Sequence, residues 1–141
     1  MNRSLTHFDS MIEKTNEWLG ELMHELNKHD RHGAYHALRV VLHALRDRLT
    51  VNEAANLGAQ LPTLIRGIYY EGWRPAAVPV RERKKEQFLS HVRESYKHDE
   101  SVDVEEVVRA VLRVLANRVS AGEIEDITHS LPKELNSLWG T

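Results

Sequence analysis

Apolar residues recur along this chain at the three- and four-residue spacing of an amphipathic helix. One stripe runs from Phe8 through Ile12 and Trp18 to Leu26, and a second occupies one face of residues 31–49. No segment alternates apolar and polar residues in the manner of a half-buried strand. The pattern predicts an all-α protein of about seven or eight helices.

Helix-start signals punctuate this pattern. The predicted N-caps, capping boxes and first-turn prolines are Asp30, Thr50 with Glu53, Pro62, Asp103, Ser120 with Glu123, and Pro132. A fifth helix is expected over residues 81–98. Gly72, Pro75 and Pro79 indicate a linker over about residues 72–81.

The chain also repeats itself. Adding 70 to positions 38–69 gives 108–139 without a gap, and eight of these 32 pairs are identical. Upstream, Phe8–Ile12 is similar to Phe88–Val92 at an interval of 80. We therefore predict a compact helical bundle of two tandem four-helix units about a pseudo-twofold axis. Residues 1–141 would form one domain, with repeat 1 over about 7–73 and repeat 2 over about 82–140, because units this small bury little surface alone.

The two halves carry a specific resemblance. The stretch DRHGAYHALRVVLHALRDRLTVNEAANLGAQLPTLIRGIYYEGW resembles the signature of the prokaryotic domain-of-unknown-function family 2267, and GEIEDITHSLPKELNSLWG is similar to its C-terminal motif. The resemblance extends from about Phe8 to Trp139. It implies a small, all-helical bacterial protein with duplicated halves, and it carries over no activity, cofactor or catalytic residue.

Composition narrows the function classes. The 141 residues include 41% apolar and 28% charged residues, as in an ordinary globular protein, and the net charge of −2 gives no drive toward nucleic acids or anionic lipids. Without cysteine, thiolate chemistry and cysteine-based metal sites are excluded. No segment has the roughly 18 apolar residues of a membrane span, and no signal peptide is recognisable, so we expect a cytoplasmic protein.

Histidines form the first candidate site. His32, His36, Arg39, His43 and Arg46 fall on one arc of the predicted second helix, opposite its apolar face, so we expect them to be exposed. His32 and His36 stand one turn apart and could share a metal, with His29 or Asp30 as a third ligand. An ordinary solvated face is the alternative that we favour.

Two arginines form the second candidate site. Arg48 and Arg118 hold equivalent places at the ends of their helices, where a guanidinium can bond the last carbonyls. They could also pair with Glu53 and Glu123. The interpretation that we favour is a structural clamp, and the alternative is an anionic ligand held between the halves.

A cluster of large residues closes the fourth helix. Arg66, Tyr70, Gly72 and Arg74 have no counterpart of the same type in the second half, whereas Tyr69 corresponds to Trp139. Aromatics at such positions usually attach a helix to its neighbour. Arginine and aromatic residues are also typical of interaction hot spots. The candidate partner-binding residues are Arg66, Tyr69, Tyr70, Trp73 and Arg74.

These features favour a non-enzymatic module that binds itself or another protein, with no cofactor. No P-loop, dinucleotide turn or nucleophile–base spacing indicates an enzyme. A small-ligand or metal sensor is the first alternative, and a DNA-binding helix–turn–helix that reads bases with Arg66 is the less favoured second. The basic run at 81–85 contains a glutamate and predicts a solvated helix start.

Overall fold

The backbone of this protein is helical throughout the part of the chain that is described. The computed structural model describes residues 3–140, with side chains from residue 6 onward. Within these residues there are eight α-helices, one short 3₁₀ helix and no strand, so the predicted all-α class is confirmed. The elements are α1 (Arg3–Leu26), α2 (Arg31–Arg46), α3 (Val51–Gln60), α4 (Thr63–Tyr70), η1 (Pro75–Ala77), α5 (Lys85–Glu94), α6 (Val104–Arg118), α7 (Ala121–Ser130) and α8 (Lys133–Asn136).

The predicted capping residues start these helices, with one correction. Thr50 and Glu53 form a complete capping box at the start of α3. At α7, Ser120 Oγ accepts a hydrogen bond from the Glu123 amide at 3.2 Å, but the returning bond is not made. The Ser120 amide instead donates to the side chain of Gln60 at 3.1 Å, because α3 lies alongside α7. The second capping box is therefore only half formed.

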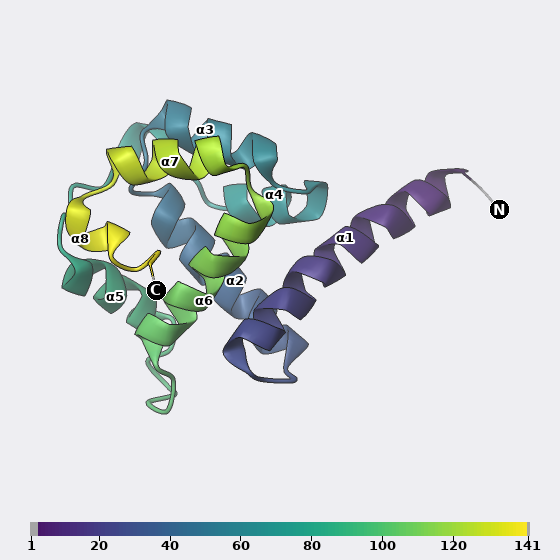
Figure 1. The fold of residues 1–141 in the computed structure, drawn as a ribbon, viewed down its shortest axis with the longest axis horizontal. Helices are drawn as coiled ribbons and strands as arrows, with labels where there is room; N and C mark the ends of the chain where they lie inside the picture. The colour runs from purple at the N-terminus through teal and green to yellow at the C-terminus, as the bar shows by residue number, and fades with distance from the viewer. Residues whose placement is uncertain (1–2, 141) are drawn as a thin grey trace.

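Two long helices, α2 and α6, pack against each other in the interior, and the remaining helices cover them in two matching sets (Figure 1). Helix α1 packs against α6, α2 and α4, and α5 packs against α2, α6 and α8. Helices α3 and α7 lie side by side above the central pair in Figure 1. Exchanging the first four helices with the last four thus reproduces the same set of contacts.

Corresponding elements lie 70 residues apart. Helices α3 and α7 begin and end at this interval. The buried residues of the outer helices follow the same interval, as Trp18, Leu19 and Leu22 in α1 and Phe88, Leu89 and Val92 in α5. The interval of 80 predicted upstream is therefore wrong: Trp18, not Phe8, takes the place of Phe88. The duplication and its pseudo-twofold axis stay predictions from the sequence.

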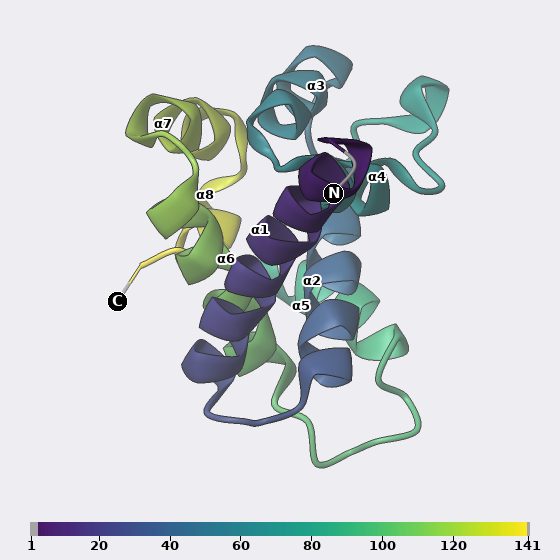
Figure 2. The ribbon, with the colours of Figure 1, turned by 90° about the vertical axis from the view of Figure 1, so that its right-hand side faces the viewer.

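The N-terminal half of α1 departs from the predicted core stripe. Helix α1 extends well beyond the other helices, and this N-terminal arm stands clear of them in Figures 1 and 2. Phe8 and Ile12 are 56% and 51% exposed, whereas Trp18 is buried. The apolar pattern correctly predicted a helix here, but only residues from about 15 onward meet another helix. We call residues 3–14 the arm.

The linker and the fifth helix also differ from the prediction. Helix α5 spans Lys85–Glu94 rather than residues 81–98, and the non-helical connection continues to Lys84. The Val80 amide donates to the Asp47 carbonyl at 2.7 Å, which holds the connection on the end of α2. Residues 81–84 are all charged, so no apolar contact draws them into the helix. Gly72, with φ of 70°, turns the chain out of α4.

Candidate functional site

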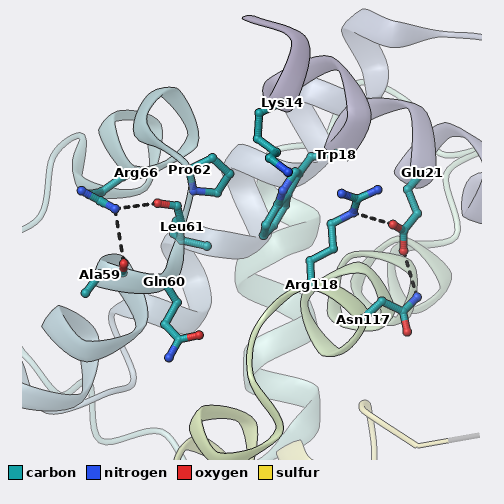
Figure 3. A pocket seen from close by; sticks show the side chains of 10 residues that line it. All are labelled: Lys14, Trp18, Glu21, Ala59, Gln60, Leu61, Pro62, Arg66, Asn117 and Arg118. Atoms are coloured by element: carbon teal, nitrogen blue, oxygen red, sulfur yellow. Dashed lines mark hydrogen bonds and ion pairs between the residues drawn. The ribbon is translucent and has the colours of Figure 1, made fainter. Parts of the chain in front are cut away.

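A cleft of about 570 Å³ lies where α1, the α3–α4 junction and the C-terminal end of α6 meet (Figure 3). Its lining residues are Lys14, Trp18 and Glu21 from α1, Ala59, Gln60, Leu61, Pro62 and Arg66 around the junction, and Asn117 and Arg118 from α6. We call it the first cleft. It brings together the Leu61–Pro62 step and Arg118, which the sequence suggested separately.

Arg118 is held by α1 on one wall of this cleft (Figure 3). Its Nε donates to Glu21 Oε1 at 2.6 Å, and its Nη1 lies 3.8 Å from a carboxylate oxygen of Glu17. The guanidinium carbon lies 6.0 Å from the centre of the Trp18 ring. The suggested pairing with Glu123 is therefore wrong, because α1 packs on α6 and places Glu21 closer.

Arg48 occupies the equivalent position at the end of α2 and is buried. Its Nη1 donates to the Ala44 carbonyl at 2.9 Å, so it bonds a last-turn carbonyl as predicted. Its Nη2 donates to Glu82 rather than to Glu53, whose carboxylate is engaged in the capping box of α3. The guanidinium carbon lies 5.0 Å from the Phe88 ring centre. Arg48 and Arg118 thus each lie over the aromatic ring of an outer helix, Arg48 on α5 and Arg118 on α1.

Arg66 caps the C-terminal end of α3. Its Nε donates to the Gly58 carbonyl at 2.8 Å, and its Nη2 donates to the carbonyls of Ala59 at 3.3 Å and Leu61 at 2.8 Å. These carbonyls have no partner within the helix, and a guanidinium stabilises them. The side chain on which the helix–turn–helix alternative relied is therefore bound to the protein's own backbone.

Tyr69 belongs to the core rather than to an exposed surface. Its side chain is fully buried, and its hydroxyl donates to the Ala54 carbonyl at 2.7 Å. Burial, with a smaller contribution from the neighbouring Tyr70, raises the pKa of the Tyr69 hydroxyl well above its ordinary value. Tyr69 therefore joins α4 to α3 from inside and is not accessible to a partner.

The other aromatic residues of the predicted corner form a half-buried stack. The Tyr70 ring lies 4.9 Å from that of Tyr69 and 5.3 Å from that of Trp73. Trp73 Nε1 is buried and has no hydrogen-bond partner among the described residues. Arg74 is exposed at the end of this stack. The five predicted residues thus divide into a helix cap, a core residue, a packed pair and one surface arginine.

The two candidate metal ligands, His32 and His36, make separate contacts. His36 Nε2 lies 3.4 Å from the Ser95 carbonyl, and its ring meets that of Tyr96 edge-on at 5.1 Å. His32 is exposed. Among residues 3–140, no three histidine, aspartate or glutamate side chains come together in a group that could hold a metal ion.

The opposite end of the predicted histidine face is not exposed, which corrects that expectation. Arg46 is buried, and its Nη1 donates to the Tyr69 and Glu71 carbonyls at 2.7 Å each. His43 Nε2 lies 2.7 Å from the Ile68 carbonyl, so it carries the hydrogen. Burial, followed by the charges of nearby arginines, lowers the pKa of His43 although the bond to Ile68 opposes this. Helix α4 covers this end of α2, which the pattern of α2 alone did not reveal.

The first cleft offers groups for binding rather than for acid–base chemistry. Its one carboxylate, Glu21, accepts hydrogen bonds from Arg118 and Asn117 and is already paired. Its other polar groups are amides and cations, beside the apolar Trp18 and Leu61. Lys14, Gln60 and Asn117 were not predicted as site residues. Their only sequence signal was their distance of one repeat interval from residues near Arg48.

Comparison with known proteins places the chain in a family. No helix among the described residues is long and apolar enough to cross a membrane. No curated protein matches the chain. The model of a family described as "Uncharacterized conserved protein (DUF2267)" matches residues 15–138, from the point in α1 where the arm ends. The chain therefore belongs to the DUF2267 family, as the resemblance of its two motifs implied.

Proposed function

We propose that this protein is a non-enzymatic helical module that associates with a second copy of itself through the apolar face of its N-terminal arm. The observation that carries the proposal is the exposure of Phe8 and Ile12, which are more than half accessible on a helix that stands clear of the body (Figure 1). Single exposed apolar residues are common on protein surfaces. These two instead continue a buried seam.

Helical geometry places the exposed pair and the core residues of α1 on one face. At 100° per residue, Phe8, Ile12 and Met11 share the side of α1 that carries Trp18 and Leu22 into the core. The arm therefore presents the same apolar seam without the helices that cover it in the body. Burying apolar surface contributes about 25 cal/mol per Å², which favours a partner for this face.

The shape of the molecule favours a second copy as that partner. The apolar face of the arm points to the same side as the body, so an arm of a second copy can lie antiparallel against it with its body at the far end (Figure 2). Centred on Ser10, this arrangement places Phe8 of each copy opposite Ile12 of the other. A single twofold contact then covers both exposed faces.

The charges of the arm are compatible with such a contact. At 100° per residue, Asp9, Glu13 and Lys14 lie about 100° or more from the centre of the apolar stripe. They can therefore stay solvated when two arms pair, and no charge needs to be buried. The small net charge of −2 adds little repulsion between copies.

Sedimentation velocity tests this function. We expect the wild-type chain to sediment as a dimer at roughly 100 µM, a concentration at which micromolar homodimers are associated. Replacing Phe8 and Ile12 by glutamate should give a monomer with an unchanged circular dichroism spectrum. Val51→Glu is the matched control, since Val51 is 42% exposed but lies at the start of α3, away from the arm.

Two results would contradict the proposal. A wild-type chain that stays monomeric at this concentration would exclude a second copy as the partner. A dimer that survives the Phe8→Glu/Ile12→Glu double substitution would place the contact elsewhere.

A further inference from the structure

A second cleft, of about 450 Å³, lies between the linker, the end of α2 and the α7–α8 junction. It is the counterpart of the first cleft, because Arg48 and Pro132 line it where Arg118 and Pro62 line the other, 70 residues away. One wall differs. The first cleft is bounded by helix α1, whereas the second is bounded by the non-helical residues 79–83 of the linker.

Arg48 brings a buried and incompletely bonded cation to this cleft. The residue is only 6% exposed, and its Nε is buried without a hydrogen-bond partner among the described residues. Its Nη2 makes one contact, with Glu82 Oε1 at 3.2 Å, which is long for a bond between charged groups. The Nε–Nη2 edge is the edge with which a guanidinium holds an oxyanion through two parallel bonds, and here it is only partly used.

The linker adds two further cations. Arg81 and Arg83 are exposed, and both line the second cleft. In the described part of the chain neither makes a hydrogen bond or an ion pair. The lining thus holds three arginines against one carboxylate, that of Glu82. The backbone beside them is anchored by the bond from the Val80 amide to the Asp47 carbonyl, so the two side chains start from a fixed position.

We propose that the second cleft binds an oxyanion of the phosphate-monoester class, held by Arg81, Arg83 and the Nε–Nη2 edge of Arg48. The Glu82 carboxylate, which is partly exposed, occupies that edge in the empty cleft and turns outward when the anion enters. The phosphate group could belong to a small molecule or to a phosphorylated side chain, since both offer the same oxygens. This site does not depend on the arm.

Titration with inorganic phosphate at constant ionic strength tests the proposal. Amide and arginine Nε–Hε signals in ¹H–¹⁵N spectra follow the binding. We expect a saturable shift of the Arg48 Nε–Hε signal, with a dissociation constant of the order of 1 mM for so small an anion. Arg81→Gln/Arg83→Gln should weaken the affinity at least about five-fold, because it removes two of the three cations.

A second variant acts in the opposite direction. Glu82→Gln keeps an acceptor for Arg48 but removes the competing charge, so phosphate affinity should rise at least about two-fold. Arg74→Gln/Arg93→Gln removes two exposed arginines that do not line the second cleft, and it should leave the affinity unchanged. All three variants change exposed or partly exposed side chains, and circular dichroism verifies their fold.

Clear results would overturn the proposal. These are a wild-type chain without saturable shifts, a dissociation constant unaffected by Arg81→Gln/Arg83→Gln, or an Arg48 signal that does not move. If the site binds as proposed, titration with glycerol phosphate and with a phosphoserine peptide distinguishes the two sources of the phosphate group by the tighter affinity.

Discussion

Glu53 and Glu123 hold equivalent positions 70 residues apart, yet their surroundings shift their pKa values in opposite directions. Burial by itself would raise the pKa of Glu53, but hydrogen bonds from Ser130 and Thr50 lower it below its ordinary value of 4.5. Burial raises the pKa of Glu123, with additional repulsion from Asp126 and Glu53. The difference follows from Ser120, whose amide bonds Gln60 and leaves Glu123 without the capping bond that Glu53 has.

The same substitution should therefore have opposite effects at the two positions. Glu123→Gln should raise the melting temperature at pH 7, and Glu53→Gln should lower it, each by roughly 2–4 °C, which corresponds to about 1 kcal/mol in a domain of this size. Thermal unfolding followed by circular dichroism measures both. Equal effects of the two substitutions would show that the two carboxylates have similar surroundings.

The pH dependence provides a second measurement on the same variants. The carboxylate of Glu53 stabilises the fold above its unfolded pKa, and that stabilisation is lost as the pH falls through its lowered folded pKa. Glu123 behaves in the opposite sense, since it is better tolerated when protonated. The benefit of Glu123→Gln should therefore appear as the pH rises above about 4.5 and should vanish in acid.

At the scale of elements, one exchange of size distinguishes the two helix pairs. Gly58 of α3 lies directly under Tyr70, whose hydroxyl and ring carbons occupy the space that a Cβ atom would need. The equivalent positions carry Thr128 and Gly140, so the large and small residues are interchanged. Since Tyr70 is held between Tyr69 and Trp73, it cannot move aside freely.

Gly58→Ala should therefore destabilise the protein even though alanine favours a helix. We expect a loss of about 1–3 kcal/mol, the usual cost of overpacking. Gly67→Ala, in α4, is the matched control because no atom lies within 4 Å of its added methyl group. It should stabilise by up to about 1 kcal/mol. Urea unfolding measures both, and stabilisation by Gly58→Ala would show that Tyr70 moves easily.

At the scale of the whole molecule, the folded body begins near residue 15. The family match starts there, and Thr15 lies 70 residues before Lys85, where α5 begins. Removing residues 1–14 should therefore change the free energy of unfolding by no more than about 0.5 kcal/mol, relative to the monomeric Phe8→Glu/Ile12→Glu variant. Trp18→Ala should cost about 3–5 kcal/mol, because Trp18 is buried among α2, α4 and α6. Chemical denaturation provides both values, and a truncated chain that fails to fold would show that the arm belongs to the body.

The amino-acid sequence by itself determined the local features of this protein. Helix starts at Asp30, Thr50 and Asp103 and the restart at Pro62 lie where the residues predict, because caps and prolines act through bonds to residues only a few positions away. The interval of 70 was likewise readable, since both halves use the same local signals. The motifs also sufficed to recognise the family.

Only the tertiary structure decided which faces are covered and which charges meet. Phe8 and Trp18 belong to one apolar stripe, but only Trp18 has helices against it. Arg48 and Arg118 are equivalent in sequence, but the carboxylates that they meet, Glu82 and Glu21, lie on different elements. Periodicity describes one helix at a time, whereas burial, ion pairing and clefts depend on neighbours brought close by the packing of distant segments.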